Sequence, residues 1–370
     1  MDWNPTDTLP DAFFDVARTV YAGDPGWIPE QAKEARALFG PSHSFFEHGS
    51  AWIDLIPGKA RLAGFVHPDA RAGDEPAAYF GYWETLDDAE ACATLFQRFE
   101  AWARSKGVRQ VMGPINFRTH YAYRVRLNHF DTAPFHPGEP YNPAYYLTLL
   151  DRMGYRQSQI YHSWFGDGPT IVSAVGDAIT RVMDRAVSHG FRFTPMTPEW
   201  WLENIESLHE DTRAIFGDNP GFSQISMQEF RALMGPEKVA ASDPNCSIVV
   251  LGPEGRMVAF MLTFPDFAPL IRQGAANPLS PYELRYADHF RLLSGPTLLA
   301  KTVGVMPKFR RLGLFEIMSF LSTKASLPDY ARVATVLIRG GGLSASRAAK
   351  VFSAEGCFTH DYGLFTRTLD

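Results

Sequence analysis

The sequence predicts an α/β fold of the α+β type, with two similar halves that each form a mixed, largely antiparallel sheet flanked by helices. Helical periodicity alternates with strand-like apolar runs along the chain. The same order of elements occurs twice, and each time it ends with a glycine, Gly154 or Gly356, before an aromatic-rich strand. With 370 residues, 45% of them hydrophobic, the chain is long enough for two domains. We expect these domains at 1–166 and 167–370.

Periodicity and turn residues predict the elements of the first half in order. They are two short helices, three strands, a long helix, a strand, a helix and a last strand, at 9–21, 30–38, 51–56, 59–66, 77–83, 87–105, 108–112, 143–152 and 155–165. Asp87 is suited to cap the long helix and Gly107 to end it. A polar loop is expected at 68–76, and a long loop follows strand 108–112.

The second half repeats this order after a turn at 166–169. Its elements are three helices, a hairpin, a strand, a helix, a strand, a helix and a last strand, at 172–189, 199–216, 227–234, 246–251, 257–264, 297–305, 314–326, 332–338, 343–353 and 358–367. An irregular insert is expected at 265–296.

Composition narrows the classes of partner and compartment. The formal charge of −6 and the pI near 6.0 argue against a general nucleic-acid or anionic-membrane surface. The three cysteines are far apart and odd in number, which indicates reduced thiols. The first residues lack a signal-peptide pattern, and the apolar runs are too short to span a bilayer. We therefore expect a cytoplasmic protein with no DNA and no membrane partner.

The segment 299–315 carries the strongest functional signal. A strand-like run ends at Val305 and passes through a turn with Lys308, Arg310, Arg311 and Gly313 into an apolar-periodic helix. The first N–H groups of such a helix are unpaired and its dipole is positive at this end, which favours a phosphate or pyrophosphate. The alternative is that this turn is only a solvent-exposed connection between the strand and the helix. The lack of acidic residues from 301 to 311 favours an anion partner.

This segment resembles the acyl-coenzyme A-binding segment of the GNAT acyltransferase superfamily, a strand followed by Val-x-Pro-x-(aromatic)-Arg-x-x-Gly and a helix. The resemblance implies that the strand pairs with the pantetheine arm of coenzyme A and that the turn holds the pyrophosphate. The cofactor-binding residues that it implies are Val303, Val305, Arg310, Arg311, Gly313 and Leu314. Phe315 departs from the pattern, which has a small residue there. The segments 24–29, 45–48 and 113–117 also resemble motifs of larger GNAT-like proteins.

The first half departs from the same pattern. Where it should have a phosphate turn, it reads Gly-Tyr-Trp-Glu-Thr-Leu-Asp-Asp at 81–88. Glu84, Asp87 and Asp88 would repel a pyrophosphate. We therefore expect a degenerate first half that serves as a scaffold and as one wall of an acceptor site.

The catalytic residues are harder to place. The tyrosine that acts as an acid in many GNAT enzymes aligns with Phe352, and an asparagine before it aligns with Ala345. Tyr362 is the nearest substitute by sequence, although a tyrosine on a strand is more often a packing residue.

Two segments are candidate walls of an acceptor site. Asn116 and His120, the other two candidate catalytic residues, lie in the polar segment 113–123. Polar loops at a domain junction often bind ligands. An ordered loop whose polar groups satisfy one another is an equal alternative. The insert offers further polar side chains, Asp266, Tyr282, Glu283, Tyr286, Asp288 and His289.

The sequence thus predicts an acyltransferase that moves an acetyl or other acyl group from coenzyme A to an amine of a small molecule or peptide. No metal site is expected. Two alternatives remain open: a non-catalytic GNAT-fold binding or sensor protein, and an aminoacyl-tRNA-dependent transferase, which the mild acidity disfavours.

Overall fold

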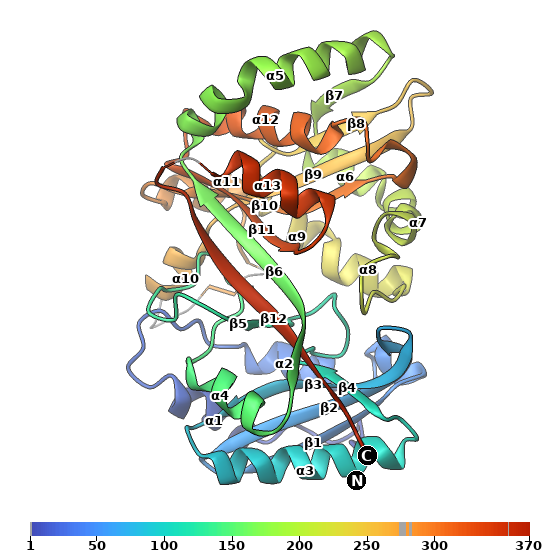
Figure 1. Cartoon of the computed structure of the whole chain (residues 1–370), viewed down its shortest axis with the longest axis vertical. Coiled ribbons are helices and arrows are strands. Elements are labelled where there is room, and N and C mark those ends of the chain that lie inside the picture. Colours follow the sequence, from blue (N-terminus) through green and yellow to red (C-terminus); the bar gives the residue numbers. More distant parts are fainter. Residues whose placement is uncertain (1, 274–278, 281–282, 354) are drawn as a thin grey trace.

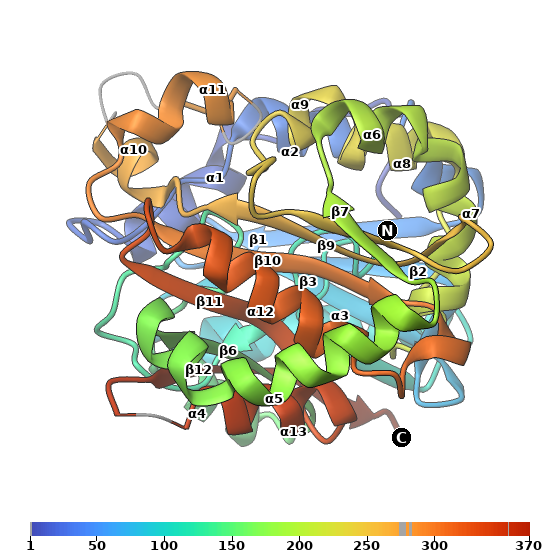
Figure 2. The ribbon, with the colours of Figure 1, turned by 90° about the horizontal axis from the view of Figure 1, so that it is seen from above.

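One continuous sheet of twelve strands runs through the molecule, and helices cover both of its faces (Figures 1 and 2). The computed structural model describes residues 2–273, 279–280, 283–353 and 355–370. The strand order is β1-β2-β3-β4-β12-β6-β11-β10-β9-β8-β7, and β5 pairs with β12 outside this path. The predicted fold class, a mixed sheet flanked by helices, is confirmed.

The strands are β1 (Ser50–Ile56), β2 (Ala60–Ala72), β3 (Glu75–Thr85), β4 (Gln110–Gly113), β5 (Val125–Arg126), β6 (Arg156–Gly166), β7 (Arg192–Pro195), β8 (Ile248–Leu251), β9 (Met257–Pro265), β10 (Thr297–Val305), β11 (Arg332–Arg339) and β12 (Phe358–Thr368). The helices are α1 (Asp11–Val20), α2 (Ala32–Leu38), α3 (Ala89–Ser105), α4 (Tyr145–Arg152), α5 (Gly168–Ser188), α6 (Pro198–Glu203), α7 (Ile205–Phe216), α8 (Met227–Met234), α9 (Pro236–Val239), α10 (Ala268–Gln273), α11 (Tyr286–His289), α12 (Leu314–Ser326) and α13 (Leu343–Val351). Short 3-10 turns occur at Ser44–Glu47, Phe290–Leu292 and Pro307–Phe309.

A few elements differ from those predicted. β2 continues to Ala72, so the expected loop 68–76 is a strand pair closed by a turn at Gly73, whose φ is 63°. The predicted helix 199–216 is two helices that meet at Asn204. β5 and β7 were not predicted, because strands of two and four residues are defined by their partners and not by a local pattern.

The last strand of each half lies beside elements of the other half. β12, at the end of the chain, pairs with β4 of the first half, and β6 pairs with β11 of the second half. β6 and β12 also pair with each other, from Phe358 beside Phe165 to Thr366 beside Arg156. Figure 1 shows these two strands running diagonally from one half of the molecule to the other. The two halves therefore share one sheet, while the boundary expected near residue 166 stays a prediction.

Alternating side chains divide each half of the sheet into two cores. In the second half, Val250 and Met261 face α5 and α12, whereas Val249 and Phe260 face α6–α9. In the first half, α3 and α4 cover one face and α1 and α2 cover the other. This arrangement places α12 and α13 on the same face of the sheet, on either side of the boundary between β10 and β11 (Figure 2).

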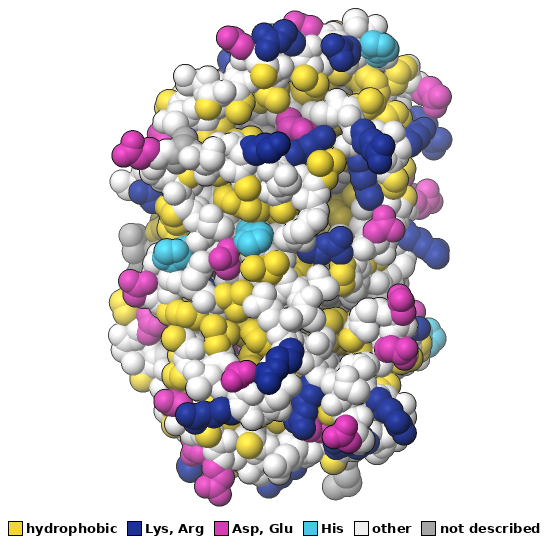
Figure 3. Space-filling model, in the orientation of Figure 1, with side chains coloured by type: hydrophobic (Ala, Val, Ile, Leu, Met, Phe, Trp, Pro, Cys, Tyr) yellow, Lys and Arg dark blue, Asp and Glu magenta, His cyan; other side chains and the backbone are white. Residues whose placement is uncertain are grey.

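The surface carries charges of both signs. Figure 3 shows Lys and Arg side chains interspersed with Asp and Glu side chains across one face, with no large area of a single sign. Within the described part of the chain, no helix combines the length and the apolar character needed to cross a membrane.

Candidate acyl-donor site

The site is built around a fork between two parallel strands. β10 and β11 pair only from Thr297 beside Arg332 to Ala300 beside Thr335. β10 then continues to Val305 with β9 as its partner, and β11 turns to follow β6. A bulge in β10 between Ala300 and Thr302 marks the point of separation. Bulges re-aim strands and often lie next to functional sites.

Beyond the fork, the predicted phosphate turn leads into α12. Gly313 precedes the helix with φ 77°, a left-handed conformation, and no side chain caps the helix. The first N–H groups of α12 therefore remain available to an anion. Lys308 and Arg311 are exposed beside this turn. The side chain of Arg310 turns away, because its guanidinium donates to the carbonyls of Val305 and Ile215 and pairs with Asp218 on the C-terminal side of α7.

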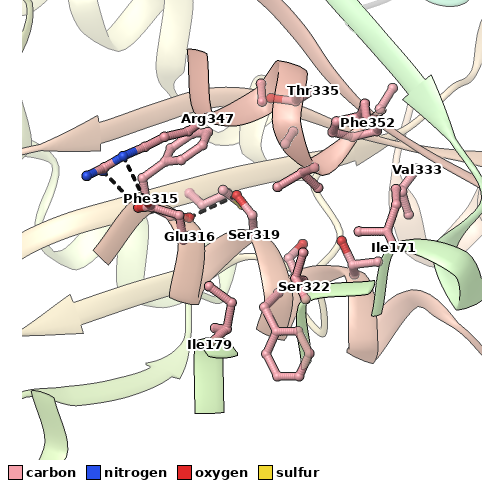
Figure 4. Close-up of a pocket in the computed structure, with 18 of the residues that line it drawn as sticks. Ile171, Ile179, Phe315, Glu316, Ser319, Ser322, Val333, Thr335, Arg347 and Phe352 are labelled. Carbon is pink, nitrogen blue, oxygen red and sulfur yellow. Dashed lines mark hydrogen bonds and ion pairs between the residues drawn. The ribbon is translucent and has the colours of Figure 1, made fainter. Parts of the chain in front are cut away.

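A narrow apolar cavity of about 50 Å³ lies between α12 and α13 and reaches the fork (Figure 4). Its walls come from α5, β9, β10, α12, β11 and α13, and include Ile171, Val175, Ile179, Met261, Leu298, Ala300, Phe315, Ser319, Phe320, Val333, Ala348, Val351 and Phe352. Phe315, the residue that departs from the GNAT pattern, lies in the wall of the cavity. Phe352, which aligns with the family's tyrosine, lies in the same wall and carries no proton to donate.

Polar groups occur at three points of this apolar lining. The hydroxyls of Ser322 and Thr335 are buried and have no hydrogen-bond partner among the described residues. Leaving a buried hydroxyl unpaired costs about 1–3 kcal/mol, so both are suited to bind polar groups of a ligand. Glu316 of α12 and Arg347 of α13 form a two-point ion pair of 2.7 and 3.0 Å at one end of the cavity (Figure 4).

The equivalent fork in the first half is filled by the chain itself. β3 and β4 pair in parallel at 77–79 and 110–112, as β10 and β11 do. Ile115 then donates its N–H to Phe80, and the Asn116 side chain accepts from the N–H of Tyr82. The segment lies so close to β3 that a Cβ on Gly81 would be 2.4 Å from the Ile115 carbonyl oxygen, so position 81 has no room for a side chain.

The helix after the first fork is also closed to anions. Asp88 caps α3, one residue after the predicted Asp87: its carboxylate accepts from the N–H of Ala91 and also pairs with Lys59. Burial raises the pKa of Glu84 to about 7, against the opposing effect of Arg61. The two halves therefore share one architecture and differ in whether the fork and the helix N-terminus are open.

Comparison with known proteins identifies this architecture. No family model matches the chain. A tandem GNAT protein from the clavulanic acid biosynthesis pathway has a TM-score of 0.51, with 97% of this chain and 94% of that chain covered at 11% identity. The chain has the tandem GNAT fold. A conserved protein of unknown function from Enterococcus faecalis V583 has a TM-score of 0.52, with 97% of this chain and 69% of that chain covered at 9% identity. Protein YghO of Escherichia coli (strain K12) is 22% identical over 330 residues, which are 87% of this chain and 82% of YghO.

Within this GNAT fold, the predicted donor residues are close together along the chain but differ in what they contact. Val303 and Val305 pack with the core beneath α12, and Leu314 is buried at the start of that helix. Gly313 shapes the turn, and Arg311 is exposed beside it. Their roles in binding stay predictions.

Tyr362 lies in the sheet interior, fully buried on β12. Its hydroxyl donates to Glu139, which also accepts from Arg126 and His360. Burial, reinforced by the charge of Glu139, raises the pKa of Tyr362 well above its ordinary value. The phenol is thus held neutral within a buried cluster that joins the loop 127–142 to the last strand.

The segment 113–123 contacts the second half at Glu229 and at Gly221, whose carbonyl accepts from the hydroxyl of Thr119. Glu229 of α8 accepts from Ser44 and Tyr121 and pairs with Arg118. The hydroxyl of Tyr121 also bonds to His43 at 2.8 Å. These contacts match the alternative in which the polar groups of the loop satisfy one another.

His120 is less completely paired than its neighbours. Its ring packs near Phe222, and its Nδ1 is buried without a hydrogen-bond partner among the described residues. Burial lowers its pKa to about 4. The catalytic roles predicted for Asn116, His120 and Tyr362 remain predictions.

The insert contributes one deeply buried carboxyl group. Asp266 follows β9 and accepts from the N–H of Ala268, and burial raises its pKa to about 7. Glu283 accepts from the N–H of Ser280. Tyr282 lies outside the described residues.

Two groups of polar residues were missed by the sequence reasoning. His162 of β6 bonds through Nδ1 to Asp361 of β12 at 2.7 Å, and both line an open hollow beside α13. Lys301, at the bulge of β10, reaches the loop 127–142 on the face away from α12. By strand alternation Lys301 shares the face of Leu299, opposite Leu298 and Ala300, which line the cavity.

Proposed function

We propose that the protein is an acyl-coenzyme A-dependent N-acyltransferase whose donor site is the fork of the second half. The observation that carries the proposal is the combination of an open fork, the uncapped N-terminus of α12 and an apolar cavity with two unpaired hydroxyls. The first half has the same fork but fills it with Ile115 and Asn116.

Each part of this site has a chemical role. The N–H groups at the start of α12 would bind the pyrophosphate, with Arg311 and Lys308 adding positive charge. The hydroxyls of Ser322 and Thr335 would bond to amide groups of the pantetheine arm. The free side of β10 beyond Ala300 would align the thioester for attack, which lowers the barrier through proximity and orientation.

The cavity must widen to take this ligand. Ligand pockets usually measure about 300–1,000 Å³, whereas this cavity measures about 50 Å³. The Glu316–Arg347 ion pair joins the two helices that would have to part. We therefore infer that the donor enters as this ion pair opens.

Proton transfer in this site differs from the common GNAT arrangement. The amine acceptor must lose a proton before attack, and the departing thiolate must gain one. Phe352 and Ala345 take the places of the usual tyrosine and asparagine, so water or the thiolate itself would take the proton. The acceptor would be an amine of a small molecule or peptide.

Thermal unfolding with acetyl-coenzyme A, octanoyl-coenzyme A and coenzyme A tests the proposal. At about 100 times its dissociation constant, a ligand adds roughly 2.7 kcal/mol, which raises the melting temperature by a few degrees. We expect this rise in the parent and a smaller rise in Arg311→Glu. Lys324→Glu makes the same charge change on an exposed residue in the last turn of α12 and should behave as the parent.

Activity distinguishes the remaining alternatives once binding is known. Release of the coenzyme A thiol with a panel of amines would support the transferase. Binding without turnover across the panel would favour a GNAT-fold sensor. No rise in melting temperature with any thioester would rule out the acyl-coenzyme A proposal.

A further inference from the structure

Basic side chains from both halves meet on the face of the sheet opposite the donor cavity. Ala300 lines the cavity on the α12 face, but the next residue, Lys301, reaches the loop 127–142 on the other face. Lys301 and His136 both lie beside Gly138 of this loop: a Cβ placed on Gly138 would be 3.0 Å from Lys301 Nζ and 3.7 Å from His136 Nδ1. Gly138 is exposed, so this group of side chains borders solvent. The site begins one residue from the fork.

Two more cations complete the group, which we call the Lys301 cluster (Arg124, His136, Lys238 and Lys301). Lys238 of α9 is half-buried, with its Nζ 5.2 Å from the centre of the Phe264 ring. The Arg124 guanidinium lies 3.4 and 3.8 Å from the ring centres of Tyr123 and Tyr161. The cluster therefore draws on β10, α9 and the segment around β5.

The cluster lacks a counter-ion in the described part of the chain. Arg124, Lys238 and Lys301 make no ion pair there, and both ring nitrogens of His136 and Arg124 Nε are buried without a hydrogen-bond partner. His136 is only 2% exposed. Glu139, the nearest carboxylate along the loop, already accepts from Arg126, His360 and Tyr362.

Such an arrangement is costly without a ligand. Burial, together with the charges of Lys238 and Arg124, lowers the pKa of Lys301 to about 7. Burial is also the main cause that lowers the pKa of His136, to about 3, with Lys301 adding to it. Buried charges are normally paired, and buried polar groups are normally hydrogen-bonded. An anion would satisfy both requirements here.

We propose that the Lys301 cluster binds an anionic group, a carboxylate or a phosphate, carried by the acceptor amine. This inference rests on the proposed function, because it places the acceptor on the opposite side of the fork from the acyl donor. An anion held at Lys301 would leave the acceptor's amine near the point where β10 and β11 separate. The acceptor would then be an amino acid or a phosphorylated amine rather than a simple alkylamine.

Anion binding can be measured without any acyl donor. Melting temperatures would be recorded at constant ionic strength in sodium chloride, sodium phosphate and sodium malonate, for the parent and for Lys301→Met. We expect phosphate or malonate to stabilise the parent, and the anion that does so identifies the class. Lys301→Met should lose this effect, with at least about tenfold weaker anion affinity by calorimetry.

Two controls separate this cluster from other sites. Lys324→Met removes an exposed lysine and should keep the full anion effect. Arg311→Glu disturbs the turn before α12 and should also keep it, although its donor binding falls. In chloride, Lys301→Met should be at least as stable as the parent, since it removes an uncompensated charge.

Other results would overturn the inference. Equal stabilisation of the parent and Lys301→Met by both anions would place the binding elsewhere, and no stabilisation of the parent would exclude the site. A Lys301→Met variant that loses coenzyme A binding but keeps anion binding would assign Lys301 to the donor instead. Failure of every thioester to bind would remove the proposed function, while the anion measurements would still be informative.

If an acyl-coenzyme A donor is found, turnover of paired amines with and without an anionic group tests whether the Lys301 cluster binds that group. Ethanolamine and O-phosphoethanolamine differ only in the phosphate, and isopentylamine and leucine differ in the carboxylate. The parent should prefer the anionic member of at least one pair, and Lys301→Met should lose that preference. A parent that prefers the neutral member of both pairs would contradict the inference.

Discussion

At the scale of single residues, Gly313 shows why a glycine stands before α12. Its φ of 77° favours glycine, and a Cβ there would lie 2.9 Å from Val182 Cγ1. We expect Gly313→Ala to lower the free energy of unfolding by roughly 1–3 kcal/mol and to weaken donor binding, because the turn before α12 must shift. Urea unfolding and thermal shift with acetyl-coenzyme A would measure both effects.

Gly176 provides a matched control for this substitution. It lies within α5, and a Cβ there would meet Phe320 at 3.6 Å, an ordinary contact. Gly176→Ala should stabilise the chain by roughly 0.5–1 kcal/mol, since alanine has the higher helix propensity. Equal effects of the two substitutions would contradict the strained conformation of Gly313.

The buried carboxyl group of Asp266 predicts how the stability of the protein depends on pH. Burial raises the pKa of Asp266 to about 7, well above the ordinary value of a carboxyl group; the charge of Glu139 raises it as well, and Arg272 opposes the change. The folded state therefore holds this proton more tightly, and the associated stability is present below about pH 4 and is lost as the pH rises towards 7. Asp266→Asn keeps a side-chain acceptor for Ala268, so it should gain stability relative to the parent over this interval, by at least about 1 kcal/mol. Unfolding curves at pH 4, 5.5 and 7.5 would show this gain, and a difference that does not vary with pH would contradict it.

The sequence reasoning reached features that depend on neighbours along the chain, such as the turn at Gly313, whose φ is 77°, and it missed the cap of α3 by one residue, Asp88 instead of Asp87. It did not reach the contacts of Lys301 or Tyr362. The Glu139–Tyr362 bond joins residues more than 200 positions apart in the chain. Strand alternation gives the face of Lys301, but its position beside Gly138 depends on a loop more than 150 residues earlier in the chain. These contacts require the register of the whole sheet.

At the scale of elements, the Glu316–Arg347 ion pair connects α12 to α13 across the donor cavity. Its two side chains are 18% and 25% exposed, so solvent screens the pair and its loss should cost no more than about 1 kcal/mol. We expect Arg347→Met to bind acetyl-coenzyme A more tightly than the parent, because the helices no longer have to break the pair before they part. Calorimetric titration would measure the affinity.

A control and a contrary result are available for this prediction. Arg231→Met removes a more exposed ion pair, with Glu206, away from the cavity and should leave the affinity unchanged. Weaker binding by Arg347→Met would mean that Arg347 itself contacts the donor, and that the pair does not restrain the cavity.

Most elements were predictable because their signals are local. Periodicity and capping indicated the long helices and the central strands of both halves. β5 was not predictable, since its two residues are a strand only through the pairing of Arg126 with Tyr362 and of Val125 with Gly363. The acidic residues at 84–88 predicted that the first half would repel a pyrophosphate, but the segment that fills its fork became visible only in three dimensions.

At the scale of the whole molecule, the exchange of β6 and β12 ties the two halves together. β12 belongs to the end of the chain, yet it pairs with β4 and β6 of the first half along most of its length. Within the second half, α5 packs against α12, so a cut after α5 would leave a further contact between the two pieces. The chain should therefore behave as one cooperative unit in spite of its internal repeat.

A cut chain tests this conclusion. The turn at His189 and Gly190, between α5 and β7, is exposed and accepts a protease site with little disturbance. After cleavage there, β12 would still lie between β4 and β6. The two pieces should thus elute as one species in gel filtration and unfold in one transition, with the thermal shift by acetyl-coenzyme A retained. An insertion of the same site at the exposed hairpin turn after Gly73 is the control, because it cuts within one half. Separation of the pieces cut at His189 under native conditions would mean that the shared strands contribute less free energy than the sheet register implies.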